Sequence, residues 1–416
     1  MKVVVAGAGV IGLWCARELA AAGADVIVVG PSQQPTMSTP ASAGWVVPVL
    51  SHPLAGPGLI PHTARQVLHR QAAFSFRGMS PALAGWLWRF VRSGSDDQFR
   101  AGLSATLDLA GDCQKQYQAL RDAGLDFELH HDGLLVVART GAGRREAQQL
   151  VETTALAGYD GKNDNLDARS IRDLEPALAT DVAGGVHARD EMHVHPGQLN
   201  DALTAAALKS GIDVRDATVE RIVPATRGQW TVVTSDGPLI ADKVVLAAGY
   251  WSKQLAATLG TRLPLQSAAG VSVTALGPRP PRLPLKLLEA SVALTPFNRG
   301  VRLAGRFTLG PPPASVSRRQ LRSVVAAALP YLGSWRPEEV TAVHAGLRPV
   351  TPDSLPLIGE LPGRRGVIAA TGHGMLGLTL APGTAAEVVH QVTTGAPSDI
   401  GTPFALTRFS GLRNTR

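Results

Sequence analysis

The first thirty residues constrain the fold most, because they place a glycine pattern between a predicted strand and a predicted helix. Residues 2–6 include three consecutive valines and predict a short buried strand. The run GAGVIG at 7–12 has the form G-x-G-x-x-G, and apolar residues at helical spacing predict a helix over 10–22. A second strand over 25–29 completes a βαβ unit of the length typical of dinucleotide binding.

Each glycine of this run has a mechanical role. Gly7 permits the tight turn, Gly9 lets a pyrophosphate approach the backbone, and Gly12 lets the helix pack closely on the sheet. The free N–H groups of Val10 and Ile11 at the helix start would face the phosphates. We therefore expect these five residues to bind a dinucleotide, the alternative being a glycine-rich turn that binds nothing.

The residue that ends the second predicted strand departs from the usual pattern. An Asp or Glu normally stands there and holds the ribose hydroxyls, whereas this chain has Gly30. No Arg or Lys follows to take a 2′-phosphate, so NADP is not favoured. We expect Ser32, Gln33 or backbone groups to contact the ribose, and the dinucleotide to be held less tightly than usual.

Composition excludes several classes of protein. With 45% hydrophobic residues in 416, the chain can bury a large core in two or three domains. The net charge of +7 is dispersed along the sequence, so we expect no nucleic-acid partner. Cys15 and Cys113 are too few for a disulfide framework, and a reduced cytoplasmic setting fits. No stretch is long and apolar enough to span a bilayer.

One segment leaves a membrane contact open. Residues 81–91 read PALAGWLWRFV, which combines Trp and Phe with a basic residue and could dock on a membrane surface. We favour a core helix of a second domain. A peripheral position at the inner face of the membrane remains the alternative to a purely cytoplasmic one.

A pair of histidines raises the question of a metal. His193 and His195 alternate and would share one face of a strand, but only Glu191 accompanies them. We expect no metal site and interpret this segment as a structural or substrate-side loop.

The remaining pattern predicts an α/β chain. Strands at 219–223 and 229–234, with a turn before Leu239, predict a small antiparallel meander, and a buried strand follows over 243–249. Residues 264–335 predict a second domain, from which 343–349 and 366–371 return to the first. The predicted helices lie at about 81–91, 101–123, 143–157, 198–209, 317–329 and 379–393.

Six motifs together carry a family resemblance. They are VVVAGAGVIG at 3–12, TPASAGWVVP at 39–48, PLAGPG at 53–58, VVLAAGYWS at 244–252, GLRPVTPDSLPLIG at 346–359 and TGHGMLGLTLAPGTA at 371–385. Over nearly its whole length the chain resembles the D-amino-acid oxidase/dehydrogenase (DAO) superfamily of FAD oxidoreductases, and within it most the bacterial D-amino-acid dehydrogenases.

The resemblance implies a fold of two discontinuous domains. A Rossmann-like FAD-binding domain of the glutathione-reductase type would comprise 1–50, 165–255 and 340–400. An α+β substrate domain built on an antiparallel sheet would comprise 51–164 and 256–339, with a tail at 401–416.

It also implies which residues hold FAD. Val219 would meet the adenine through its backbone, and Ala248 and Gly249 would border the pyrophosphate and ribityl region. The last helix would point its positive end at the flavin and stabilise the reduced ring. The residues expected to line the flavin itself are Ser42, Ala43, Gly44, Trp45, Gly372, His373, Gly374, Met375, Leu376, Gly377 and Leu378. We expect non-covalent attachment, with His52 and His373 as the residues that keep a covalent link open.

For catalysis, the resemblance assigns the substrate carboxylate to Arg348. A planar, permanent cation can bind a carboxylate with two hydrogen bonds, although an interdomain salt bridge to Asp353 is the alternative. Hydride would pass from Cα to flavin N5, giving an imine that water converts to a 2-oxo acid and ammonia. His373 and His52 would be polar neighbours of the substrate or would only bond structural groups, and Tyr250 would enter the site or pack beneath the flavin.

Three departures from the family bear on the substrate. Family members often carry Lys-Gly-Tyr-Ser where this chain has AGVS at 269–272, and a Glu where it has Thr308; Gly30 is the third. The resemblance implies a D-amino-acid dehydrogenase that passes electrons to a quinone, a dye-like carrier or O₂. The alternatives are a secondary-amine dehydrogenase or oxidase of the proline or hydroxyproline type, and a non-catalytic basic protein that binds a membrane or a polyanion.

Overall fold

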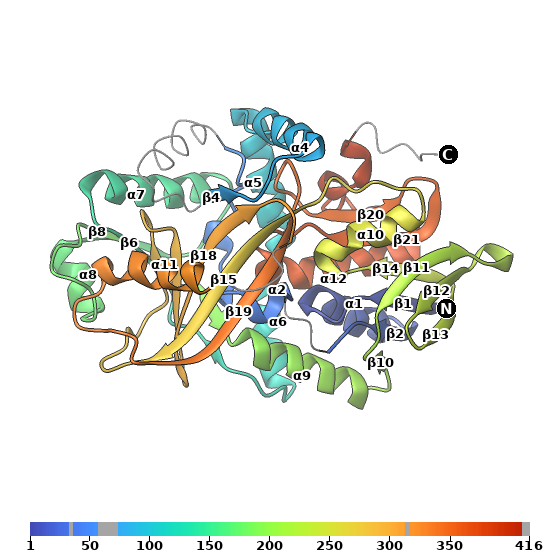
Figure 1. The fold of residues 1–416 in the computed structure, drawn as a ribbon, viewed down its shortest axis with the longest axis horizontal. Coiled ribbons are helices and arrows are strands. Elements are labelled where there is room, and N and C mark those ends of the chain that lie inside the picture. The colour runs from blue at the N-terminus through green and yellow to red at the C-terminus, as the bar shows by residue number, and fades with distance from the viewer. Residues whose placement is uncertain (33–35, 57–73, 313–316, 410–416) are drawn as a thin grey trace.

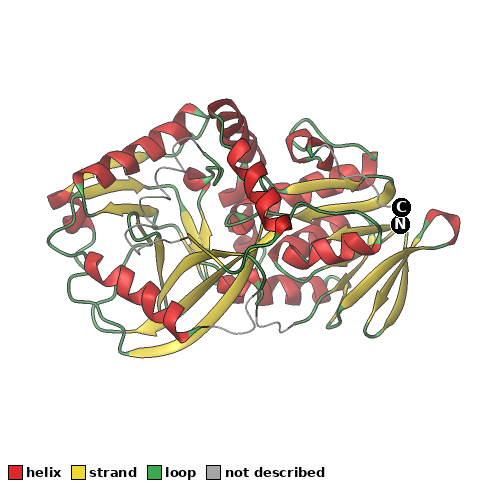
Figure 2. Ribbon diagram, turned by 45° about the horizontal axis from the view of Figure 1, so that its top comes forward, coloured by secondary structure: helices red, strands yellow, loops and turns green. Residues whose placement is uncertain are grey.

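The computed structural model describes residues 1–32, 36–56, 74–312 and 317–409 (Figure 1). Gln33, the end of the 53–58 motif and the last residues of the predicted tail lie outside these ranges. Figure 2 shows two sheets side by side, with helices packed around them.

The first sheet is built around the N-terminal βαβ unit. Its six strands run in the order β10-β2-β1-β14-β21-β20, and β20 alone is antiparallel to its neighbour. Their bounds are β1 Lys2–Ala6, β2 Asp25–Val29, β10 Asp213–Arg215, β14 Lys243–Leu246, β20 Leu357–Leu361 and β21 Arg364–Thr371. This confirms the predicted Rossmann-like sheet.

Both faces of this sheet are buried, which explains the unbroken valine run of β1. Val3 and Val5 face the helices α1 (Val10–Ala21), α9 (Pro196–Lys209) and α12 (Gly377–Thr394). Val4 and Ala6 face the opposite core, which includes residues of the meander β11 (Val219–Pro224), β12 (Trp230–Thr234) and β13 (Gly237–Ala241) and of α10 (Ser252–Thr258).

The second sheet has nine strands and is mostly antiparallel. Its order is β19-β15-β18-β17-β16-β6-β8-β7, with β4 paired to β18. The long strands β15, β18 and β19 cross the middle of Figure 1. The bounds are β4 Phe74–Phe76, β6 Leu134–Ala138, β7 Asn163–Asp167, β8 Gly184–Ala188, β15 Gln266–Leu276, β16 Leu285–Leu287, β17 Val292–Phe297, β18 Gly300–Leu309 and β19 Glu339–Val350.

Two smaller groups complete the chain. Strands β3 (Trp45–Val46), β9 (Met192–Val194) and β5 (Leu129–His130) form a short antiparallel sheet. The other helices are α2 Ser38–Ala41, α4 Pro81–Arg92, α5 Asp96–Ala110, α6 Cys113–Asp122, α7 Gly141–Leu156, α8 Ala168–Leu174 and α11 Arg318–Ala328.

Pairing across the sheets corrects the predicted domain boundaries at 165 and 340. Strand β19 pairs with β15 along its length, so 343–349 belong to the large sheet rather than returning to the first. Strands β7 and β8 also lie in the large sheet, beside β6. The helix predicted over 101–123 is two helices, because Gly111 interrupts it with a φ of +43°.

Helix α4 is fixed to the protein by one side. Leu83 and Trp86 are buried, and Trp86 Nε1 donates to the Pro264 carbonyl at 3.0 Å, while Trp88 is exposed. The core-helix interpretation therefore accounts for one face of α4. In the described part of the chain, no helix combines the length and apolar character needed to cross a bilayer.

A close helix crossing gives a first prediction. Helix α12 passes α5 at Gly383, where a Cβ would lie 1.8 Å from the Leu109 carbonyl oxygen. Gly383→Ala should therefore lower the free energy of unfolding by about 1–3 kcal/mol through overpacking. Gly85 in α4 has no atom near its Cβ position, so Gly85→Ala should be neutral or stabilising, by about 0.5–1 kcal/mol. Urea unfolding of both variants measures this, and equal stabilities would contradict the close crossing.

Candidate active site

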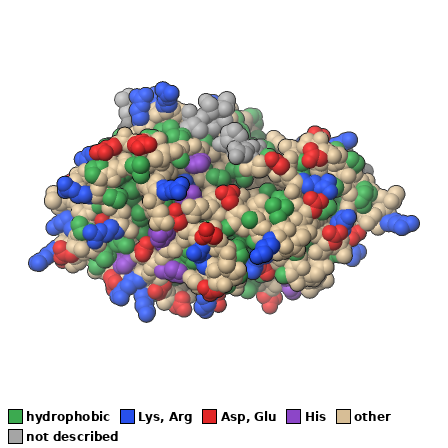
Figure 3. Space-filling model, turned by 90° about the horizontal axis from the view of Figure 1, so that it is seen from below, with side chains coloured by type: hydrophobic (Ala, Val, Ile, Leu, Met, Phe, Trp, Pro, Cys, Tyr) green, Lys and Arg blue, Asp and Glu red, His purple; other side chains and the backbone are tan. Residues whose placement is uncertain are grey.

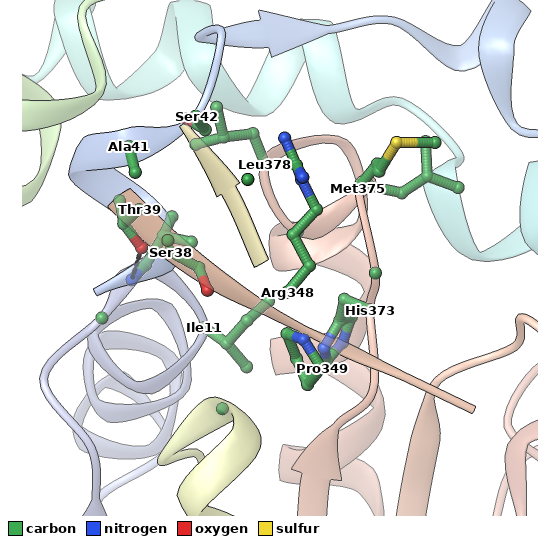
Figure 4. Close-up of a pocket in the computed structure, with 18 of the residues that line it drawn as sticks. Ile11, Ser38, Thr39, Ala41, Ser42, Arg348, Pro349, His373, Met375 and Leu378 are labelled. Atoms are coloured by element: carbon green, nitrogen blue, oxygen red, sulfur yellow. Dashed lines mark hydrogen bonds between the residues drawn. The ribbon is translucent and has the colours of Figure 1, made fainter. Parts of the chain in front are cut away.

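A cavity of about 720 Å³ lies between the two sheets. Its walls come from four places: the loop after β1, the 37–54 segment, the central strands of the large sheet, and the loop before α12. Figure 4 shows how residues of these segments converge on it.

The glycine loop forms the floor of the cavity with very close backbone contacts. Gly7 has a φ of +126°, and a Cβ on it would lie 2.4 Å from the Ala247 oxygen. A Cβ on Gly12 would lie 1.8 Å from the Gly7 oxygen, so Gly12 packs the helix on the loop as predicted and does not itself line the cavity. Gly9 faces the open space, and beside it Thr39 Oγ1 accepts a hydrogen bond from Val10 N at 3.2 Å. Ile11 also lines this end.

The structure explains why no acid follows β2. A Cβ on Gly30 would lie 2.5 Å from Ala8 N, because the glycine loop passes directly over this position. The Ser32 hydroxyl and backbone N–H both donate to the Asp216 carboxylate, at 2.5 and 2.8 Å, so the hydroxyl is engaged away from the cavity. Val219 lines this end, where the resemblance placed its backbone against the adenine, and Glu220, which no sequence motif indicated, lines it too.

The segment predicted to line the flavin is held by the second sheet. Thr295 Oγ1 donates to the Ala43 carbonyl and accepts from Trp45 Nε1, both at 2.8 Å. Gly44, at a φ of +87°, brings its backbone against β9, where a Cβ would lie 2.2 Å from the Val194 oxygen. Ser42 also lines the cavity, and its buried hydroxyl has no hydrogen-bond partner among the described residues.

The loop before α12 forms the opposite wall. Six of its seven predicted residues line the cavity, and Gly372 alone does not. Helix α12 begins at Gly377 without a side-chain cap and without an acidic residue in its first turn. Its free N–H groups and the positive end of its dipole are therefore available at the cavity. Ala248 and Gly249 complete the wall beside it.

Arg348 is a partly buried cation without a carboxylate partner among the described residues. Its guanidinium lies over the backbone of Gly270, where a Cβ would be 2.1 Å from Nη1, and Nη1 donates to the Arg306 carbonyl at 2.9 Å. Burial lowers the pKa of Arg348 to about 10, so the group stays charged at neutral pH. The alternative partner Asp353 pairs with Arg408 instead, at 2.7 Å, which rules out the proposed interdomain salt bridge. Figure 4 shows the Arg348 side chain reaching between Met375 and Leu378.

The other three predicted catalytic residues differ in position. His373 Nε2 bonds Thr384 Oγ1 at 2.9 Å, and burial lowers the pKa of His373 to about 3. His52 lines the cavity and bonds Thr154 Oγ1 at 3.1 Å; burial, with a contribution from Lys286, lowers its pKa to about 4. Both rings are neutral at physiological pH. Tyr250 does not line the cavity, so its assignment to the site requires correction.

Two of the positions that depart from the family pattern, Ala269 and Thr308, lie on the face of the large sheet that points away from the cavity. Gly270 and Phe307 line the cavity, whereas Ala269 and Thr308 pair with each other on the opposite face of the sheet. There Thr308 Oγ1 lies 2.8 Å from Ser75 Oγ. These departures therefore do not change the polarity of the cavity.

The sequence analysis also missed charged residues of the cavity wall. Lys286, in the short strand β16, lines the cavity together with Glu146 and Arg306. Burial lowers the pKa of Lys286. Lys286 belongs to none of the sequence motifs, and only the folded chain brings it to the cavity.

These features define a class of protein. A cavity with a glycine floor, an open helix N-terminus and a buried hydroxyl without a partner fits a flavin dinucleotide, since each would meet a polar part of it. The model of the family described as DAO, FAD dependent oxidoreductase, matches residues 2–391. The chain belongs to this family, and its cofactor is FAD.

Relatives at about 31% identity support this assignment, and solved structures share the fold. The D-amino acid dehydrogenase of Paramagnetospirillum magneticum is 31% identical over 96% of both chains, and that of Xylella fastidiosa is 31% identical over 92% of this chain and 90% of its own. Glycine oxidase from Geobacillus kaustophilus shares the fold with a TM-score of 0.76 at 23% identity, over 99% of this chain and 100% of its own. L-proline dehydrogenase from P. horikoshii also shares the fold, with a TM-score of 0.72 at 16% identity, over 98% of this chain and 97% of its own.

The crowding at Gly30 gives a second prediction. Gly30→Glu should weaken FAD binding by about tenfold or more instead of restoring a ribose contact, because its Cβ meets the glycine loop. Gly30→Ala should cause a similar loss, which would show that the cause is steric. Fluorescence titration of the apoprotein with FAD measures both, and tighter binding by Gly30→Glu would contradict the explanation.

Proposed function

We propose that the protein is an amino-acid dehydrogenase that oxidises D-amino acids. The observation that carries the proposal is Arg348, a partly buried permanent cation in the cavity wall with no carboxylate partner among the described residues. Removing such a group from water costs free energy unless an anion pairs with it. The carboxylate of an amino acid matches the planar geometry of the guanidinium. The names of the relatives at about 30% identity support the D-amino-acid class.

The residues of the chain would act mainly by orientation. Arg348 would hold the carboxylate with two hydrogen bonds and so fix the position of the Cα–H bond. The first turn of α12 would stabilise negative charge that develops at its N-terminus, by about 0.3–2 kcal/mol. FAD supplies the two-electron acceptor in this family.

The histidines would contribute by being uncharged. With pKa values near 4 and 3, His52 and His373 add no positive charge to the cavity at neutral pH. They therefore neither repel the substrate ammonium nor compete with Arg348 for its carboxylate. After loss of one proton, the amine nitrogen can assist departure of the hydride, and the resulting imine hydrolyses to a 2-oxo acid and ammonia.

A secondary amine acid of the proline type is the second candidate. It is favoured by the apolar part of the cavity lining, which includes Leu54, Leu288, Val292 and Phe307. Its carboxylate would use Arg348 in the same way. The non-catalytic alternative loses its basis, because the chain belongs to a family of oxidoreductases and positive and negative side chains are intermixed on the face seen in Figure 3.

Anaerobic bleaching of the flavin by a panel of D-amino acids, L-amino acids and proline separates the candidates. We expect D-amino acids to bleach it fastest. Parallel assays with a dye acceptor and with an oxygen electrode distinguish a dehydrogenase from an oxidase. Failure of every D-amino acid to reduce the flavin would overturn the proposal.

The role of Arg348 gives a third prediction. Arg348→Leu should raise KM by about 10- to 100-fold, since a charge-assisted hydrogen bond contributes about 1.5–3 kcal/mol, and should leave the flavin spectrum unchanged. Gly270→Ala should also raise KM, because its Cβ displaces the guanidinium while keeping the charge.

The matched control is Arg408→Leu, which breaks the Asp353 pair outside the cavity wall. It should lower Tm without changing KM. If Arg348→Leu and Arg408→Leu had the same KM as the unaltered enzyme, Arg348 would be removed from the site.

A further inference from the structure

Two histidines face each other on the short sheet behind the cavity wall. In the β5–β9 pair, His130 lies directly opposite His193, and His193 lies opposite Trp45 on β3. Residues directly opposite each other in an antiparallel pair point to the same face, with Cβ atoms about 4.5–5.5 Å apart. The two imidazole rings are stacked, with their centroids 4.6 Å apart.

His193 is oriented like a metal ligand. Its side chain is fully buried, and its Nε2 lies 3.1 Å from the Pro296 carbonyl oxygen, which can only accept a hydrogen bond. The ring proton therefore sits on Nε2, and the bare Nδ1 has no partner among the described residues. A ring nitrogen held by a backbone carbonyl, with the other lone pair free, is the usual arrangement around a bound metal.

Two carboxylates lie close to the histidine pair. One ligand atom from each of His130, His193 and Asp132 lies within 4.8 Å of the other two. In addition, Glu128 Oε2 lies 3.4 Å from His130 Nε2. The His130 and Asp132 side chains are 28% and 45% exposed, which gives an ion a path from solvent. Figure 3 shows several His side chains reaching the surface among Asp and Glu side chains on the face it presents.

We propose that His130, Asp132 and His193 bind a divalent transition-metal ion of the zinc type. Two imidazoles and one carboxylate are ligands that zinc accepts, with a fourth position open to solvent. The two rings lie within 10° of parallel, so the His130 ring has to turn about its side-chain bonds to address the same ion. It is partly exposed and can turn, whereas Pro296 holds His193 in place.

A metal ion at this site would stabilise the part of the cavity wall that contains Ala43 and Trp45, which we call the flavin wall. Pro296 follows Thr295, which bonds both Ala43 and Trp45 of that wall. An ion on His193 would therefore fasten the end of β17 to the short sheet. This inference is independent of the substrate proposed above.

His195, which the sequence places on the same strand face as His193, is not part of this cluster. His195 Nδ1 accepts the Gln198 N–H at 3.2 Å and caps α9, so that atom is already used. The ligands that complete the site come from a strand and turn about sixty positions earlier in the chain, and only the β5–β9 pairing brings them together.

The test uses the holoenzyme after treatment with a chelator. Calorimetric titration with Zn²⁺ should show one equivalent bound, and His130→Ala and Asp132→Asn should each weaken binding about tenfold or more. His131→Ala is the matched control, since His131 is an exposed neighbour that bonds Gln118 and is not one of the proposed ligands. Both test positions are partly exposed, so these variants should fold.

A spectroscopic readout identifies the ligands. Co²⁺ should give a d–d difference spectrum in the unaltered enzyme and in His131→Ala, but not in His130→Ala. Zn²⁺ should raise Tm in the same two proteins, because an ion that binds only the folded state stabilises it. Absence of a one-equivalent site, or an equal loss of binding in His131→Ala and His130→Ala, would overturn the proposal.

Discussion

The architecture of the cavity depends on the positive charge of Arg348, which pairs with no carboxylate among the described residues. Arg348 lies partly buried in the cavity wall, and among the described residues its guanidinium donates one hydrogen bond, to the Arg306 carbonyl. Removing a charge from water costs several kcal/mol unless a partner of opposite sign completes it. Among the described residues no carboxylate pairs with Arg348, and Asp353 pairs with Arg408 instead, which supports the proposal that a bound anion supplies the partner.

Close backbone packing gives this charge its place. Gly270 leaves room for the guanidinium, just as Gly7 and Gly12 leave room for the turn between β1 and α1. At each of these positions a Cβ would lie 2.4 Å or less from another atom, so a residue with a side chain would clash there. The same constraint at Gly30 excludes the usual ribose acid, and the dinucleotide end of the cavity is built differently from the common pattern as a result.

Local patterns predicted the parts of the fold that depend on local interactions. The βαβ unit and α12 followed from strand and helix periodicity and from glycines at fixed spacing. The boundaries at 165 and 340 were wrong, because membership of β7, β8 and β19 in the large sheet is decided by partners far away in sequence. Arg348 and most flavin-wall residues could be named from motifs, whereas Lys286 and Glu220 could not, since neither belongs to a motif and only the folded chain brings them to the cavity.

The proposed function depends on Arg348 binding the carboxylate of the substrate. A crystal structure of the FAD complex with a bound, unreactive carboxylic acid tests it most directly. The account predicts that both carboxylate oxygens lie within hydrogen-bond distance of the Arg348 guanidinium. A carboxylate bound elsewhere in the cavity, with Arg348 paired to an acidic side chain of the protein, would contradict it.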